Sequence, residues 1–133
     1  MKKLTALLVA LVICAMGSFA MADTLKVAIP NDATNEGRAL LLLQSIGALT
    51  LDADAGITAT PKNVTSSVAE IEFVEMEAAT VPNALQDVDF AIINNNYALD
   101  NGLNPAKDGL AIESADSPYS NVLCVRRTTR TRI

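Results

Sequence analysis

Arg38 is the residue of this sequence best placed to bind a charged ligand. It falls in the second turn of an expected helix, residues 33–46, which follows an expected strand, residues 25–29. In α/β folds, ligands bind at the edge where strands end and helices begin. Helix N-terminal amides and a guanidinium together favour a carboxylate, which arginine holds with two parallel hydrogen bonds. The alternative, a surface Arg38 paired with Glu36 or another nearby acid, stays open at this stage.

Asn94 and Asn121 occupy similar positions next to two other expected strands. Asn94 follows the continuous apolar run 90–93, and Asn121 precedes the apolar run 122–125. An amide side chain donates and accepts hydrogen bonds at once, which suits a ligand that carries both an ammonium and a carboxylate group. Each residue could instead be a turn asparagine that satisfies its own backbone.

The remaining composition argues against an enzyme or a cofactor protein. The chain has no histidine, so the commonest general base and the commonest metal ligand are both missing. It also has no Ser-x-x-Lys, no Cys-x-x-Cys and no glycine-rich phosphate loop. The carboxylate pairs Glu70/Glu72 and Glu75/Glu77 each share one face of an expected strand, which we interpret as a solvated face. We therefore expect no enzymatic activity, no cofactor and no metal.

The charge distribution excludes a further class of function. All 15 acidic residues and all but two of the 10 basic ones follow residue 22. Four of those basic residues belong to the short C-terminal stub, residues 126–133, which has no aromatic residue. A body this acidic does not suit binding to a phosphate backbone, so we expect no nucleic-acid partner.

The first 22 residues have the order of features that defines a secretory signal peptide. Lys2 and Lys3 precede an uncharged apolar run, residues 4–14, and Ala20-Met21-Ala22 gives an A-x-A cleavage pattern. The run is shorter than the ~20 residues that a membrane-spanning helix needs. We therefore predict export to the periplasm, with a mature chain that begins near Asp23.

The two cysteines raise separate questions. Cys14 lies in the apolar run and could be a lipidation site that anchors the chain in a membrane, although the bulky Ile13 before it is unusual for such a site. Otherwise Cys14 is simply an apolar residue of the signal. Cys124 would then be the single cysteine of the mature chain, and its apolar neighbours indicate a strand residue.

Between these ends, strand and helix patterns alternate, which favours an α/β fold with helices packed on a sheet. Residues 71–76 have the alternation of a strand, with Ile71, Phe73 and Val74 competing for the core. Residues 90–93 have the continuous apolar character of a central strand. Asn31 and Asp32 offer an N-cap for the helix that follows. The expected strands are 25–29, 71–76, 90–93, 109–112 and 122–125. The expected helical segments are 33–46, a short helix after Thr80, residues 95–101, and a weak one at 64–69.

Three long segments, 27–51, 73–99 and 102–125, resemble the NlpA family of methionine-binding lipoproteins. These are the substrate-binding proteins of an ABC importer. The matching signatures are PND-x-TN-x-GR-x-LLLLQ, IN-x-x-YA and NPAKDG…SPY-x-N. The resemblance implies one lobe of a periplasmic-binding-protein (type II-like) fold, with a three-layer α/β/α arrangement and helices on both faces of the sheet. It divides the chain into a signal peptide (1–22), a partial substrate-binding lobe (23–125) and the basic stub.

The same resemblance assigns roles to individual residues. Arg38 would hold the carboxylate of D- or L-methionine or a related amino acid, while Asn94 and Asn121 would hydrogen-bond its amino and carboxylate groups. Asn31, Asn35 and Tyr97 fall in the matched motifs and would shape or cap the site. The implied protein partner is the methionine ABC permease of the inner membrane.

Two departures from the family pattern affect the expected function. The pattern's first lobe is not found between Ala22 and Asn31, and the basic stub replaces the family's continuation. A single lobe lacks an apolar lid, so we expect methionine binding that is millimolar or absent, and possible self-association through the exposed lobe face. The alternative functions are a non-binding remnant and an exported interaction protein that uses this face.

Overall fold

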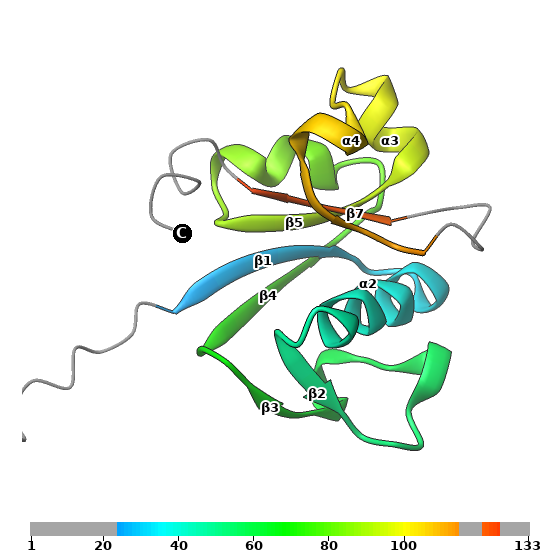
Figure 1. The fold of residues 1–133 in the computed structure, drawn as a ribbon, viewed down its shortest axis with the longest axis vertical. Coiled ribbons are helices and arrows are strands. Elements are labelled where there is room, and N and C mark those ends of the chain that lie inside the picture. Colours follow the sequence, from blue (N-terminus) through cyan, green and yellow to red (C-terminus); the bar gives the residue numbers. More distant parts are fainter. Residues whose placement is uncertain (1–23, 115–120, 126–133) are drawn as a thin grey trace, which may run out of the picture.

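The computed structural model describes residues 24–114 and 121–125, which contain the five strands of one mixed sheet. They are β1 (Leu25–Pro30), β4 (Ile71–Met76), β5 (Phe90–Asn94), β6 (Gly109–Ile112) and β7 (Asn121–Val125). The strand order is β4-β1-β5-β7-β6 (Figure 1). β1 pairs in parallel with β4 and β5, and β7 pairs antiparallel with β5 and β6. β5 is therefore the middle strand, as its continuous apolar run predicts.

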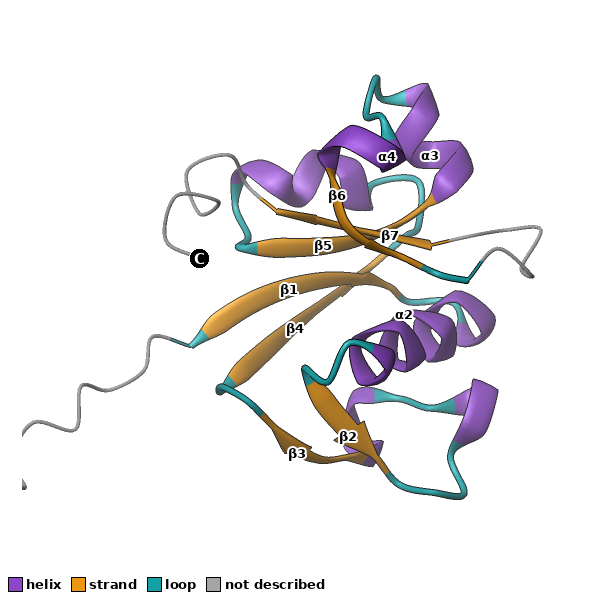
Figure 2. Cartoon of the chain, in the orientation of Figure 1, coloured by secondary structure: helices purple, strands orange, loops and turns teal. Residues whose placement is uncertain are grey.

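The helices and a small second sheet complete the described part of the chain (Figure 2). The α-helices are α2 (Ala33–Ser45), α3 (Asn95–Asp100) and α4 (Pro105–Asp108). The 3₁₀ helices are η1 (Gly56–Thr58), η2 (Pro61–Asn63) and η3 (Val81–Gln86). The second sheet pairs β2 (Leu49–Leu51) with β3 (Val64–Ser67) in antiparallel fashion.

Helical elements cover both faces of the large sheet, so the expected α/β layering is confirmed. Figure 1 shows α2 on one side of the sheet and α3 and α4 on the other. Successive side chains of β1 point to opposite faces of the sheet and so contribute to both cores. Val27 and Ile29 belong to the core beneath α2, and Ala28 belongs to the core on the opposite face. On the α2 side, Leu40 is completely buried, a burial that contributes about 2 kcal/mol.

Helix α2 has the capping that its sequence predicts. The Asp32 carboxylate accepts a hydrogen bond from the Asn35 backbone N–H at 3.1 Å, which satisfies one of the free amides of the first turn. The helix ends at Ser45, and Gly47 beyond it has a φ of 75°, a conformation that favours glycine. Because the helix starts directly after β1, its first two turns lie at the carboxyl edge of the sheet.

The weak helical pattern at residues 64–69 was a wrong prediction. Residues Val64–Ser67 form strand β3, which pairs with β2, a strand that was not among those expected. The β-branched Val64 and Thr65 favour extended backbone. The Thr65 hydroxyl also donates to the Thr50 carbonyl across the pair at 3.1 Å, so tertiary pairing outweighs the local helical preference.

Two smaller expectations also differ from the structure. The short helix expected after Thr80 is the 3₁₀ helix η3, and the Thr80 hydroxyl donates to the Glu77 carbonyl at 2.7 Å and does not cap it. The helix expected at residues 33–46 ends one residue earlier, so Ile46 lies beyond the last helical residue and is 46% exposed. β4 is a strand as expected, but its alternation is not strict, because Phe73 packs on the core beneath α2 and the adjacent Val74 packs on the opposite core. β4 is an edge strand, and its apolar side chains are only half-buried.

Several predictions concern residues outside the described ranges. They are the signal peptide at 1–22, its candidate lipidation site Cys14, and the basic stub at 126–133. Within residues 24–114 and 121–125, none of the helices combines the length and the apolar character that crossing a bilayer requires.

Candidate functional site

Asn94 and Asn121 lie side by side at one edge of the sheet. Asn94 is the last residue of β5 and Asn121 the first of β7, and the two are partners in the antiparallel ladder. Asn94 Nδ2 donates to Asn121 Oδ1 at 3.0 Å. Asn94 is 7% exposed and Asn121 has no exposed surface. The structure thus joins two residues that the sequence placed at separate strand ends.

The first turns of α2 bring Asn35 and Arg38 to the same place. Asn35 Oδ1 accepts a hydrogen bond from Asn94 Nδ2 at 2.7 Å and another from Arg38 Nη1 at 3.3 Å. This arrangement follows from the sheet order, because β1 leads into α2 and is the neighbour of β5. Of the three residues given secondary roles by the family resemblance, Asn35 is the one that joins this network.

Glu113 is the member of the cluster that the sequence did not reveal. It follows β6 and forms an ion pair with Arg38, with Nη2 to Oε2 at 2.6 Å and Nε to Oε1 at 3.2 Å. The Arg38 side chain is 12% exposed and that of Glu113 is 23% exposed. Like Asn94, Glu113 is a polar residue at a strand end, and that rule, applied to residues 109–112, would have indicated it.

The backbone of β7 holds Glu113 in position. Its Oε2 accepts from the Asn121 backbone N–H at 3.0 Å, and its own backbone N–H donates to the Asn121 carbonyl at 2.9 Å. We call Asn35, Arg38, Asn94, Glu113 and Asn121 the polar cluster. They form a closed ring of hydrogen bonds that links α2 to three strand ends.

Two polar atoms of the polar cluster remain without a partner among the described residues. They are Asn94 Oδ1 and Asn121 Nδ2, both buried. A buried polar atom that lacks a hydrogen bond costs about 1–3 kcal/mol. The cluster therefore combines an unsatisfied acceptor, an unsatisfied donor, a guanidinium and a carboxylate, which is a set suited to a ligand with both an ammonium and a carboxylate.

Asn31 and Tyr97 lie outside this ring. Asn31 is an exposed residue at the end of β1, and its backbone N–H donates to the Met76 carbonyl at 2.8 Å. Tyr97 lies in α3 and packs against the core on the sheet face opposite α2. The roles that the resemblance gives these two residues remain predictions.

A buried carboxyl group, Glu36, lies in the first turn of α2 beside the cluster. Burial raises its pKa to about 7, and a hydrogen bond to Glu75 together with the charges of Glu75 and Asp32 adds to the shift. The sequence left open that Arg38 pairs with Glu36. In the structure, the guanidinium of Arg38 pairs with Glu113. Within the described ranges, no group of three or more Asp, Glu or Cys side chains is arranged to hold a metal ion.

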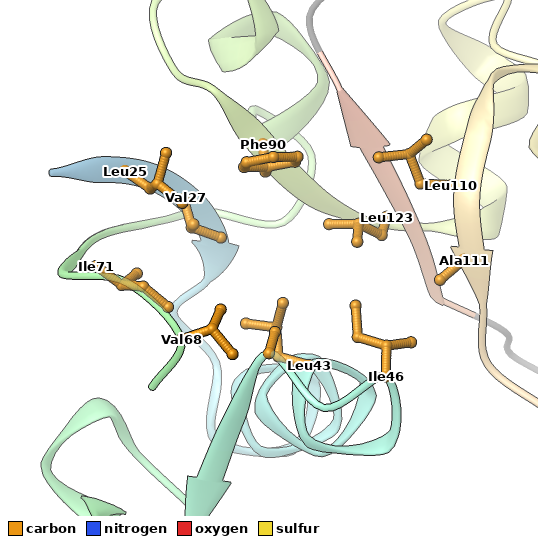
Figure 3. Close-up of a pocket in the computed structure, with 11 residues that line it drawn as sticks. Leu25, Val27, Leu43, Ile46, Val68, Ile71, Phe90, Leu110, Ala111 and Leu123 are labelled. Carbon is orange, nitrogen blue, oxygen red and sulfur yellow. The ribbon is translucent and has the colours of Figure 1, made fainter. Parts of the chain in front are cut away.

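An apolar pocket of about 290 Å³ lies between the sheet and α2, toward the amino ends of β1 and β5 (Figure 3). Figure 3 shows side chains of the sheet, among them Phe90 and Leu123, facing Leu43 and Ile46 of the helix side. Its lining also includes Val68, which is 77% exposed. The polar cluster lies at the opposite, carboxyl edge of β5, so the two features are separate.

Comparison with known proteins gives a consistent family. The family model described as NlpA lipoprotein matches residues 20–132. A curated relative, the probable D-methionine-binding lipoprotein MetQ of Vibrio cholerae, is 44% identical over 104 residues. The alignment covers 78% of this chain and 39% of that relative, so the chain spans about two fifths of the relative's length.

Solved structures give the same result for the fold. A nutrient-binding protein from Burkholderia cenocepacia, solved bound to methionine, is 44% identical with a TM-score of 0.70, covering 82% of this chain and 46% of that one. An ABC transporter periplasmic substrate-binding protein from Coxiella burnetii is 40% identical with a TM-score of 0.68, covering 84% and 46%. The described fold therefore corresponds to part of such binding proteins.

Proposed function

Since the chain belongs to the NlpA lipoprotein family, which consists of substrate-binding lipoproteins and not of enzymes, we propose that residues 23–125 form a lobe that binds an amino acid of the methionine type. The observation that carries this proposal is the polar cluster. The ion pair of Arg38 with Glu113 presents both signs of charge at the edge of the sheet where the strands end. A zwitterionic ligand has the matching pair of charges.

Within this proposal, Arg38, Asn94 and Asn121 have defined tasks. Arg38 holds the ligand carboxylate, as a guanidinium does in a bidentate pair. Asn94 Oδ1, which has no partner in the described structure, accepts from the ammonium group. Asn121 has no exposed surface, so it contributes Nδ2 only if the neighbouring side chains shift, and otherwise it acts by holding Asn94.

The structure gives a physical reason to expect weak binding by this chain. The Glu113 carboxylate already occupies the Nε and Nη2 edge of Arg38, so an arriving carboxylate competes with it. We propose a dissociation constant in the millimolar range, equivalent to about −4 kcal/mol. Export, a lipid anchor at Cys14 and delivery of the ligand to a methionine ABC permease are parts of the same proposal.

A thermal-shift screen of residues 23–133 against the amino acids tests the proposal. We expect a rise in melting temperature with millimolar D- or L-methionine that is lost in Arg38→Ala and kept in Lys62→Ala, which removes an exposed positive charge elsewhere. Calorimetry then gives the affinity. No shift with any amino acid, or an unchanged shift in Arg38→Ala, would rule out the assigned site.

We propose self-association as a second candidate function, but through the apolar pocket and its rim and not through the exposed lobe face expected from the sequence. Val68, Ile46 and Leu110 line it and are 77%, 46% and 43% exposed. Contiguous exposed apolar side chains mark interaction sites more often than single ones do. A second copy of the chain is the proposed occupant, and sedimentation should show a dimer that Val68→Asp dissociates. A monomer at high concentration would exclude it.

A further inference from the structure

We propose that Asp32 is a positioning residue that fixes which way the side-chain amides of the polar cluster point. The proposal rests on the proposed function only for its consequence for ligand binding. Asp32 is the N-cap of α2 and does not itself belong to the ring. Its carboxylate accepts from Asn35 Nδ2 with both oxygens, at 2.9 and 3.0 Å.

The orientation of Asn35 follows from the charge of Asp32. A carboxylate accepts hydrogen bonds and donates none, so the NH₂ end of the Asn35 amide must face it. The carbonyl end, Oδ1, then faces Asn94 and Arg38, and it accepts from both. Arg38 can only donate, which supports the same orientation from the other side.

The constraint passes on to the next two amides. Because Asn35 presents an acceptor, Asn94 must turn Nδ2 toward it, and the second N–H of the same group reaches Asn121 Oδ1. Both N–H bonds of Asn94 are then used on protein acceptors. Its Oδ1 and Asn121 Nδ2 are consequently the two atoms left without a partner. If all three side-chain amides were flipped, Asn94 would present its NH₂ group at this position. An ammonium group needs an acceptor there.

Nuclear magnetic resonance of the side-chain amides tests this relay without any ligand. In ¹H–¹⁵N spectra, Asp32→Ser should shift the Nδ2 resonances of both Asn94 and Asn121. Serine is a good N-cap, and its hydroxyl donates as well as accepts, so it caps α2 but leaves the orientation of Asn35 to the longer, 3.3 Å hydrogen bond from Arg38 Nη1. The matched control is Asp100→Ser, which removes an exposed carboxylate at the end of α3 and should leave these resonances unchanged.

Removing Asp32 also removes a charge that acts on Glu36, so all variants are made in a Glu36→Gln background. If Asp32→Ser does not fold, Asp32→Asn keeps the cap and the side-chain volume while freeing the orientation. A shift at Asn35 alone, with Asn94 and Asn121 unchanged, would overturn the proposal. So would equal shifts at both asparagines in Asp100→Ser.

Ligand binding provides the second, separate measurement. Where methionine binds, Asp32→Ser should weaken it by about tenfold, since the acceptor that faces the ammonium is no longer fixed. An unchanged affinity together with shifted Asn94 and Asn121 resonances would contradict the binding role of the relay. Absence of binding in every variant, including the parent chain, would instead count against the proposed function. The role of Asp32 in orienting the amides would then be tested by the spectra alone.

Discussion

Arg38 and Glu113 lie 75 positions apart in the chain, yet Arg38 Nη2 and Glu113 Oε2 are 2.6 Å apart. The pair joins α2 to the end of β6, an edge strand of the sheet. It closes the polar cluster and gives the guanidinium a fixed orientation.

This ion pair should contribute measurably to stability. In a double-mutant cycle of Arg38→Ala and Glu113→Ala, urea denaturation should give a coupling free energy of about 1–2 kcal/mol, since both groups are largely buried and share two hydrogen bonds. The same cycle on the exposed residues Lys62 and Glu72 should give less than ~0.5 kcal/mol. Similar values for both cycles would contradict the prediction.

Gly37 should resist substitution even though it lies inside a helix. Replacing a helical glycine with alanine usually stabilises by about 1 kcal/mol. Here the added Cβ would lie 1.9 Å from the backbone oxygen of Ile57 in η1, so one of the two segments must move. We expect Gly37→Ala to lower the free energy of unfolding by about 1–3 kcal/mol. Thr34→Ala, on the exposed side of the same helix, is the control and should not lower it.

Glu36 should make the stability of the chain depend on pH. Its pKa is raised from 4.5 to about 7 in the folded state, so between these values the folded chain binds more protons than the unfolded chain. Stability therefore falls as the pH rises through this window, and the penalty is complete above the folded pKa and absent below the unfolded one. Relative to Glu36→Gln, the parent chain should lose about 1–3 kcal/mol between the two ends of the window. Parallel pH profiles of parent and variant would show that this assignment is wrong.

Cys124 should be chemically inert in the folded chain. It is 2% exposed in β7, and burial, followed by the negative charge of Asp108, raises the pKa of its thiol to about 11. In a Cys14→Ser chain, thiol labelling should be slow under native conditions and fast in urea. The control is Ser66→Cys in a chain that lacks both natural cysteines. Position 66 is exposed in β3, so this cysteine should label rapidly both under native conditions and in urea. Equally rapid labelling of native Cys124 would show that β7 opens readily.

Much of the fold was predictable because it depends on local patterns. The continuous apolar run of β5 predicts a central strand covered on both faces, and the residue types of β4 favour extended backbone. The Asp32 cap and Gly47 likewise define the two ends of α2 from nearby residues alone. Strand β3 was predicted incorrectly, because its pairing with β2 is a tertiary contact that outweighs a weak local preference.

For the candidate site, the sequence determined which polar residues stand at strand and helix ends: Arg38, Asn94 and Asn121. It also determined their chemistry, since residue type alone sets what each side chain can donate or accept. The tertiary structure decided which of them meet. Only the strand order places β1 beside β5, and only the antiparallel pairing of β6 with β7 brings Glu113 to the Asn121 backbone and to Arg38. Contacts between residues so far apart in the chain depend on how the whole sheet assembles, and no local spacing encodes them.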